Sequence, residues 1–305
     1  MAAFAFEQSL NAIQLGLTLF LLTAGLTLTF GFMGVINLAH GSVYMIGAYV
    51  LAAVSLRTGS FLIGIAAALL TTGIIGLLLE LSLVRRLYRR GHLDQVLATF
   101  AVILIANGLT TWLFGRQPIQ LDIPSYLSGP LRLTADLSYP KYRAFLIALG
   151  VAIAVLLHIV MGRTRVGMRV RAGSTHRELV RALGVDVRGL FALVFGLGSM
   201  LAGFAGALIA PLQAVEAGMG DQIVILAFVV IVIGGVGSVR GAFFASLMVG
   251  IVDTLGRVVL PFLLKSFTAP AVSTALSIGV SSTAVYLLMA AVLIVRPAGL
   301  FAGRA

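Results

Sequence analysis

Nine apolar runs, separated by short polar segments, fill most of this sequence. A helix that crosses the hydrocarbon core of a bilayer needs about 20 apolar residues, and most of the runs reach or approach that length. We therefore expect an all-α polytopic transmembrane helical bundle of about eight to ten spans, forming one transmembrane domain over residues 1–305. The runs lie at 10–33, 38–56, 61–84, 94–114, 144–161, 189–212, 222–236, 241–263 and 278–295, and two of them are short.

The composition indicates an integral membrane protein, so the lipid bilayer is the first expected partner. Hydrophobic residues make up 60% of the chain, against about 45 to 50% in an average soluble domain. Lys and Arg outnumber Asp and Glu by 21 to 10, which in a soluble protein would suggest a nucleic-acid partner. Most of this excess lies in two loops, so we expect no nucleic-acid partner here.

The basic residues predict which side of the membrane each loop faces. Residues 85–92 hold four arginines, and residues 162–188 hold seven arginines against two acids, so the positive-inside rule places both loops in the cytoplasm. Counting spans from these loops puts the N-terminus outside and the C-terminus in the cytoplasm. Residues 115–141 then face outward, and their four prolines predict an irregular external segment.

Polar residues interrupt the apolar stretch GFMGVINLAHGSVYMIGAY at 31–49. On a lipid-facing helix, Asn37 and His40 would carry unmatched polar groups into hydrocarbon, at a cost of several kcal/mol for each group. We predict that the chain bends here between two spans and that the polar side chains face a protein-lined path or satisfy exposed backbone. A simple capped turn in the cytoplasm is the alternative. The residues assigned to this path or hinge are Gly34, Asn37, His40, Gly41 and Tyr44.

Glycines break a second apolar run, VIGGVGSVRGAF at 232–243. Gly235 and Gly237 predict a broken helix or hinge that lines the route or contacts a partner, and a plain cytoplasmic turn is the alternative. The run at 189–212 carries small residues at four-residue spacing instead, such as Ser199 with Gly203. Because such residues let helix backbones approach closely, we expect this run to be a packing helix.

The second cytoplasmic loop contains a short predicted helix, in the sequence RAGSTHRELVRALGVDV. Thr175 followed by Glu178 fits a capping box, and Gly184 stands where a glycine would end the helix. Two interpretations stay open: the helix rests on anionic lipid headgroups, or it docks a cytoplasmic partner. The apolar stripe of this helix consists of Leu179, Ala182 and Leu183.

The sequence excludes several classes of chemistry. A P-loop needs a lysine after its glycines, and neither Lys141 nor Lys265 follows such a motif, so the chain cannot bind ATP in that manner. The chain has no cysteine and its four histidines form no HExxH pair, so we expect no enzyme activity, no metal site and no cofactor of its own. An ion-driven carrier would keep acids near the midplane, where only Asp253 is a candidate. These gaps favour a channel-like or partner-powered transporter.

The remaining charges in the apolar runs are expected to be structural. Asp253 and Arg257 stand four residues apart on a predicted helix, so they can form an ion pair. Glu80 lies close to the arginines that begin at Arg85, and we expect it to be a charge at the membrane interface.

Three blocks of the sequence carry a resemblance to a known family. GVINLAHGSVYMIGAY, RAGSTHRELVRALGVDV and GGVGSVRGAFFASLMVG lie in order between residues 31 and 250. Together they resemble the membrane permease of bacterial branched-chain amino acid ABC importers. The resemblance implies a permease of the bacterial inner membrane that moves leucine, isoleucine and valine. It also implies partners: a homologous second permease, two cytoplasmic ATPase subunits that bind ATP and Mg, and a periplasmic amino-acid-binding protein.

Under this resemblance, residues 162–188 form a cytoplasmic coupling segment that contacts an ATPase. The implied contact residues are Ser174, Arg177, Glu178, Leu179, Arg181, Ala182, Leu183 and Gly184. Alternatives remain open at this point. Related permeases carry other small solutes, such as urea, short amides, other amino acids or sugars. An ion-coupled secondary transporter and a bare membrane anchor for other subunits are the alternatives from other classes.

Overall fold

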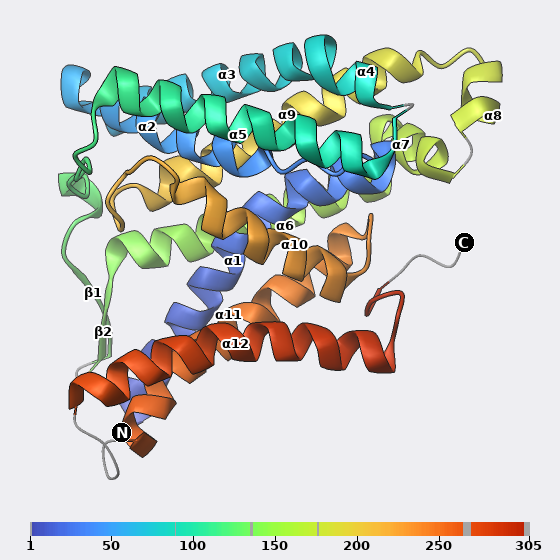
Figure 1. Cartoon of the computed structure of the whole chain (residues 1–305). Coiled ribbons are helices and arrows are strands. Elements are labelled where there is room, and N and C mark those ends of the chain that lie inside the picture. The colour runs from blue at the N-terminus through green and yellow to red at the C-terminus, as the bar shows by residue number, and fades with distance from the viewer. Residues whose placement is uncertain (1, 89, 135–136, 176, 265–269, 302–305) are drawn as a thin grey trace.

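Each of the nine predicted apolar runs forms a helix, so the predicted polytopic bundle is confirmed (Figure 1). The computed structural model describes residues 2–88, 90–134, 137–175, 177–264 and 270–301. Within this described part, seven helices are long and apolar enough to cross a membrane, and the stretches Met219–Gly234 and Gly279–Val295 are shorter but also helical and apolar. The apolar helices are α1 (Ala2–Met33), α2 (His40–Thr58), α3 (Phe61–Leu79), α5 (His92–Phe114), α6 (Lys141–Arg163), α9 (Val187–Ile209), α10 (Met219–Gly234), α11 (Val239–Leu264) and α12 (Pro270–Val295). The short helices are η1 (Glu80–Val84), α4 (Arg85–Leu87), η2 (Ser125–Leu127), α7 (Arg165–Thr175) and α8 (Arg177–Ala182).

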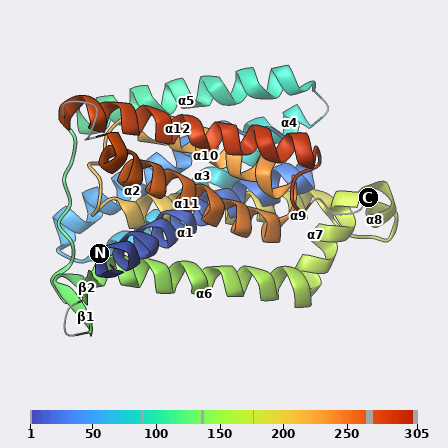
Figure 2. The ribbon, with the colours of Figure 1, turned by 90° about the horizontal axis from the view of Figure 1, so that it is seen from below.

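Helix α1 lies inside the bundle and is buried along most of its length (Figure 2). It packs against α6, α9, α10 and α11. Glycines let two of these neighbours approach: a side chain at Gly16 would collide with the α11 backbone at Leu247, and one at Gly25 with the α9 backbone at Gly198. Protein surrounds α1, and its sequence is mainly apolar without a clear division into an apolar and a polar face.

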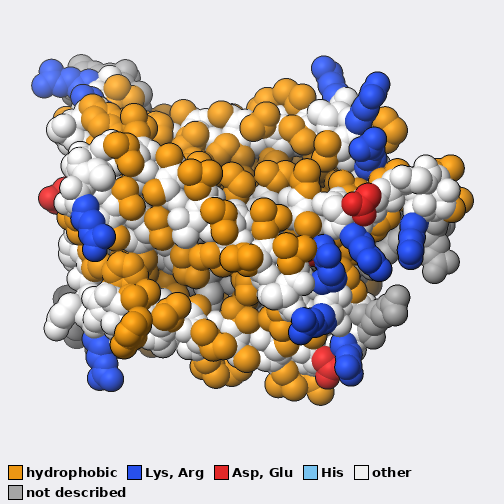
Figure 3. Space-filling model, turned by 90° about the horizontal axis from the view of Figure 1, so that it is seen from above, with side chains coloured by type: hydrophobic (Ala, Val, Ile, Leu, Met, Phe, Trp, Pro, Cys, Tyr) orange, Lys and Arg blue, Asp and Glu red, His pale blue; other side chains and the backbone are white. Residues whose placement is uncertain are grey.

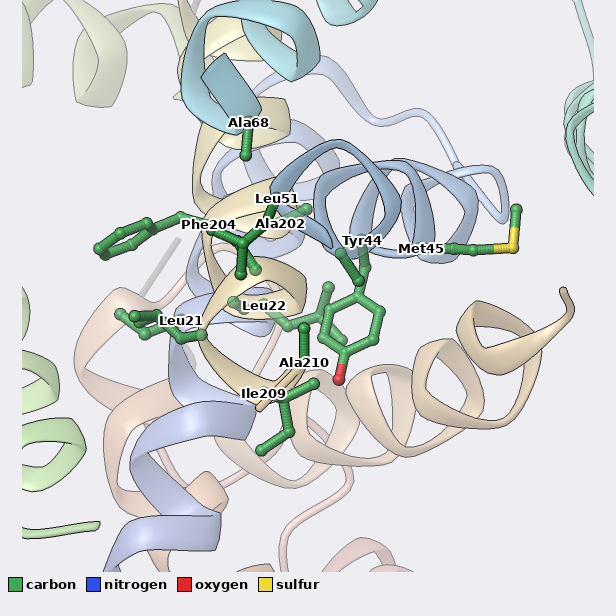
Figure 4. Close-up of a cluster of buried hydrophobic side chains, with 14 of the residues drawn as sticks. Leu21, Leu22, Tyr44, Met45, Leu51, Ala68, Ala202, Phe204, Ile209 and Ala210 are labelled. Carbon is green, nitrogen blue, oxygen red and sulfur yellow. The ribbon is translucent and has the colours of Figure 1, made fainter. Parts of the chain in front are cut away.

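The small residues of α9 bring α2 and α3 close to it. A side chain at Gly203 would collide with Thr72 of α3, and one at Gly206 would collide with the backbone oxygen of Tyr44 on α2. The predicted packing helix is therefore confirmed. The largest cluster of buried apolar side chains surrounds these contacts and includes residues of α1, α2 and α9 (Figure 4).

A two-stranded hairpin follows α5 at the end of the molecule where α1 begins (Figure 1). Strand β1 (Pro130–Thr134) pairs antiparallel with β2 (Leu137–Pro140). The prediction of an irregular segment is wrong for these residues, because Pro130 and Pro140 lie opposite each other at the edge of the ladder, where a missing N–H is tolerated. The Tyr139 hydroxyl donates to Oδ1 of Asn11 at 3.1 Å and so ties the hairpin to α1.

Charged side chains gather at the two ends of the molecule and leave an apolar belt between them (Figure 3). One end, which we call the basic end, carries α4, α7 and α8. The described arginines at this end are Arg85, Arg86, Arg90, Arg163, Arg165, Arg169, Arg171, Arg181 and Arg188. A bilayer would cover this belt. Three long helices, α1, α2 and α3, precede α4 in the chain, and because three is an odd number, α1 begins at the end opposite the basic end. The predicted pair of Asp253 and Arg257 is confirmed, with a 2.8 Å distance between Oδ2 and Nε.

Glu80 lies beside Arg85, near the basic end, but it is enclosed by protein and not exposed at the surface. Its Oε2 atom lies 3.0 Å from Nη2 of Arg85, and its Oε1 accepts a hydrogen bond from the Tyr88 hydroxyl at 2.8 Å. These partners compensate the buried carboxylate. The π-helical turn η1 joins Glu80 to Arg85 along the chain.

Candidate functional site

The chain leaves the helical conformation between α1 and α2. Gly34 follows α1 with a φ of +68°, which glycine adopts without strain, and residues 34–39 are not helical. Helix α2 begins at His40, whose Nε2 lies 3.2 Å from the backbone oxygen of Leu22. Leu22 precedes the end of α1 by eleven residues, which corresponds to about 16 Å of helix. The non-helical segment 34–39 thus runs back into the bundle before α2 starts (Figure 1).

Two backbone N–H groups of this non-helical segment take their hydrogen-bond partners from α5. The N–H of Ile36 donates to Oε1 of Gln95 at 3.1 Å, and the N–H of Leu38 donates to Oγ1 of Thr99 at 3.3 Å. Gln95 and Thr99 are both buried. Non-helical backbone at membrane depth is tolerated where protein takes the place of water, and these two side chains do so.

The sequence prediction did not include Gln95 and Thr99. A signal for them exists, because they stand four residues apart in LDQVLATF and so share one face of a helix that is otherwise apolar there. The sequence does not show that these side chains bind segment 34–39, since 59 positions separate Ile36 from Gln95. Only the folded bundle brings α5 beside the non-helical segment.

The predicted path residues lie inside the protein. The exposed fractions of Asn37, His40 and Tyr44 are 2%, 1% and 3%. Ala39, which precedes α2, gives the helix no side-chain cap, so a capped cytoplasmic turn does not describe this break. Within the described part of the chain, Nδ1 of His40 has no hydrogen-bond partner. Figure 4 shows the ring of Tyr44 beside Ala210, at the end of α9.

Gly41 has a role different from the predicted one. It lies in the first turn of α2 and not at the bend. A side chain there would collide with the backbone oxygen of Gly220, at the start of α10. Gly41 therefore lets α2 and α10 begin in contact with each other, whereas the positive φ of the bend belongs to Gly34.

The second break separates α10 from α11 and lies against the first. Gly235 and Gly237 have φ values of +95° and +80°, so the helix is broken between Gly234 and Val239 as predicted. A side chain at Gly31, one turn before Gly34, would collide with the backbone of Gly237. The structure thus brings the two glycine-rich breaks together at the end of α1, although they are 200 residues apart in sequence.

The coupling segment, residues 162–188, forms two helices where the sequence predicted one. Helix α7 adds 11 residues before the expected turns, which form α8. Gly184 has a φ of +82°, and its N–H donates to the backbone oxygen of Arg181 at 3.0 Å, as predicted for a glycine that ends a helix. The predicted capping box of Thr175 and Glu178 lies outside the described side chains, as do the side chains of Ser174 and Arg177.

The apolar stripe of α8 is exposed in this chain. Leu179 and Leu183 expose 60% and 75% of their surface, and Arg181 and Ala182 are exposed as well. Val180 is buried instead, and α8 contacts α9. Leu179 on α8 and Leu183 in the turn that follows it leave an apolar surface that no described residue of this chain covers.

Aromatic side chains fix the base of the coupling segment to the bundle. A side chain at Gly173 of α7 would collide with the ring of Phe32, at the end of α1. The Phe32 ring contacts Phe191 of α9 edge-on, with centroids 4.8 Å apart, and Phe191 contacts Tyr88 in the same way at 5.1 Å. The segment therefore stands on the ends of α1, α4 and α9.

Comparisons with known proteins place this arrangement in a family. The sequence matches the family described as the permease component of branched-chain amino acid transport systems, over residues 9–296. BraD, a high-affinity branched-chain amino acid transport system permease protein of Pseudomonas aeruginosa, is 28% identical over 267 residues, covering 82% of this chain and 85% of BraD. LivH of Escherichia coli K12, described in the same words, is 27% identical over 263 residues, with 82% and 85% covered.

An archaeal protein shows the same similarity. The probable branched-chain amino acid transport permease protein LivH of Methanocaldococcus jannaschii is 27% identical over 247 residues, covering 78% of this chain and 76% of that protein. No solved structure matches the chain. The family match over residues 9–296 includes both breaks and the coupling segment.

Proposed function

Because this chain belongs to the permease family of branched-chain amino acid transport systems, we propose that it is the membrane-spanning permease of an ABC importer for leucine, isoleucine and valine. The observation that carries the proposal is the family match over residues 9–296, which includes nearly the whole helical bundle. The apolar belt and the buried non-helical segment support it, because a permease needs both a bilayer-spanning body and polar groups inside it.

The energy for transport comes from partners in this proposal. The chain has no P-loop lysine, so ATP and Mg bind to two cytoplasmic ATPase subunits. Leu179 of α8 and Leu183, in the turn directly after α8, form the surface that docks on an ATPase. In both ribbon views, α8 projects beyond the ends of the spans (Figures 1 and 2). This position supports docking on an ATPase and not contact with lipid headgroups.

The solute path in this proposal passes the start of α2. An amino acid carries a carboxylate and an ammonium group, which need polar partners inside the membrane. The first turn of α2 has no side-chain cap, so its N–H groups suit a carboxylate. Asn37, His40 and Tyr44 are the nearby side chains that are proposed to line the path. A homologous second permease completes it, and a periplasmic amino-acid-binding protein delivers the solute.

We place the chain in the bacterial inner membrane with its basic end in the cytoplasm. The arginines of residues 85–90 and 163–188 support this orientation through the positive-inside rule. The N-terminus then lies outside and the C-terminus inside. The hairpin of β1 and β2 faces the periplasm, where the binding protein would dock.

The test is to purify the chain from its native membrane in mild detergent and to identify the proteins that accompany it by mass. We expect a second permease and P-loop ATPases. The complex, reconstituted in liposomes with the binding protein, is expected to take up labelled leucine only when ATP is supplied.

Other outcomes lead to different conclusions. Uptake driven by a proton or sodium gradient without an ATPase would establish a secondary transporter and contradict the proposal. ATP-dependent uptake of urea, an amide or a sugar in place of leucine would keep the ABC importer and replace its substrate. A chain recovered without ATPases after crosslinking, with no solute moved, would leave only the role of an anchor.

A further inference from the structure

We propose that Gln95 and Thr99 are positioning residues for transport, which hold the non-helical segment 34–39 and tie it to the cytoplasmic turn that contains Leu87, Tyr88 and Arg90. The inference rests on the proposed transport function. It adds two residues on α5 and a hydrogen-bonded connection between segment 34–39 and the cytoplasmic turn. Its basis is a set of hydrogen bonds from one buried helix face to two other parts of the chain.

Gln95 bridges the two regions with a single amide group. Its Nε2 donates to the backbone oxygens of Leu87 and Arg90, each at 3.3 Å, while its Oε1 accepts the N–H of Ile36 at 3.1 Å. The side chain is 3% exposed, so water cannot replace these bonds. Both donor hydrogens and the acceptor oxygen are used, which fixes the orientation of the amide.

Thr99 binds the backbone N–H of Leu38, two residues after the N–H that Gln95 binds. Its hydroxyl donates to the backbone oxygen of Gln95 within α5 at 2.8 Å. Because that bond uses the hydroxyl hydrogen, the oxygen lone pairs remain for the N–H of Leu38, at 3.3 Å. Ile36 and Leu38 lie on either side of Asn37, so Gln95 and Thr99 clamp the backbone that carries this path residue.

The cytoplasmic turn held by Gln95 also contacts the base of the coupling segment. Tyr88 lies in this turn and packs on Phe191, which packs on Phe32, beside Gly173 of α7. A displacement of α7 by a partner therefore acts on the turn to which Gln95 is bonded. Through the Ile36 amide, the same displacement reaches the start of α2. Such a contiguous set of contacts needs a coupling measurement to establish its role.

Matched substitutions separate this role from ordinary stability. Thr99→Val keeps the shape of the side chain and removes the acceptor for Leu38, whereas Thr99→Ser keeps the acceptor. Thr110→Val is the control, because Thr110 lies on the same helix, is 5% exposed, and its hydroxyl donates to the backbone oxygen of Ala106 on its own helix. Gln95→Met is matched by Gln14→Met, since Gln14 is buried and bonds to Thr18 on its own helix.

The experiment measures ATP hydrolysis and leucine uptake in the same reconstituted complex. We expect Thr99→Val and Gln95→Met to lower the number of leucines moved per ATP by about fivefold or more, the factor expected when one buried N–H loses its partner. Thr99→Ser restores the ratio, and the Thr110 and Gln14 variants keep it. An unchanged ratio in both test variants, or an equal loss in the controls, would overturn the inference.

A labelling measurement covers variants that lose uptake altogether or fail to assemble. The chain has no cysteine, so Ile36→Cys provides a single thiol in the segment. We expect a small maleimide to label it about fivefold faster or more in the Thr99→Val background than in the Thr110→Val background, because the clamp is released. Equal rates would overturn the clamp. A wild-type complex that moves no leucine would instead overturn the proposed function, while the labelling result would still test the clamp.

Discussion

The carboxylate of Glu80 and the guanidinium of Arg85 lie 3.0 Å apart, yet the Glu80 side chain is fully enclosed while 36% of the Arg85 side chain is exposed. The two partners are therefore not equivalent. Removing Arg85 leaves a carboxylate buried without its cation, whereas neutralising Glu80 leaves a cation that water can reach.

Arg85→Met is expected to destabilise the protein by about 3 kcal/mol or more, and Glu80→Gln by clearly less. In the double variant the buried charge is gone, so it is expected to be more stable than Arg85→Met alone. Thermal unfolding in detergent at one heating rate gives the ranking. A Glu80→Gln variant at least as damaged as Arg85→Met would show that the carboxylate is not the costly group.

The contact between α9 and α2 predicts a strong effect of a single methyl group. Gly206→Ala would place its Cβ against the backbone oxygen of Tyr44, which cannot rotate away, so we expect a loss of about 1–3 kcal/mol. Gly108→Ala on α5 is the control, because nothing lies within 4 Å of a Cβ there. It is expected to be neutral or stabilising. Equal thermal stabilities of the two variants would contradict the close approach.

Gly34 and Gly59 allow the bend to be tested at equal backbone strain. Both have a φ of +68°, so an alanine costs each a similar amount, about 1–2 kcal/mol. Only Gly34 lies at the non-helical segment, and Gly59 ends α2 in open space. We expect similar losses of thermal stability but a loss of ATP-driven leucine uptake in Gly34→Ala alone. Equal uptake by both variants would separate the bend from transport.

The exposed leucines of α8 predict the site of ATPase docking. A Leu179→Asp, Leu183→Asp double variant is expected to lose the ATPase subunits on purification, because charge replaces the apolar surface that would be buried. Leu56→Asp is the control, since Leu56 is 62% exposed but lies near the end of α2 away from the basic end. Retention of the ATPases by the double variant would move the docking surface elsewhere and favour contact of α8 with lipid.

The buried polar residues of the path predict a loss of uptake without a loss of protein. Asn37→Ala and His40→Ala are expected to reduce leucine uptake about tenfold or more, since each removes a polar group from the membrane interior. His158→Ala is the control, because His158 is exposed on α6. Uptake is compared at equal amounts of protein in the membrane. Unchanged uptake in both variants would reject a transport role for these side chains.

Much of the fold could be predicted from the sequence, because a span of about 20 apolar residues leaves few alternatives to a membrane helix. The bend at Gly34 and the helix end at Gly184 could also be predicted, since a positive φ is a local property of glycine. The burial of Glu80, the contact of Gly41 with Gly220 and the hydrogen bonds from Gln95 and Thr99 could not. Each depends on which helices lie side by side, and a single sequence does not contain that information.

The enclosed position of α1 has a consequence for synthesis. Its neighbours α9 and α11 are made more than 150 residues later, so α1 is surrounded by lipid chains until they enter the bilayer. Three of its polar side chains are satisfied without those neighbours. The hydroxyls of Thr18, Thr23 and Thr29 donate to carbonyls of the same helix and need no other segment for those bonds. The bundle is thus assembled around a helix made before α9 and α11, in which these three hydroxyls already have their hydrogen-bond partners.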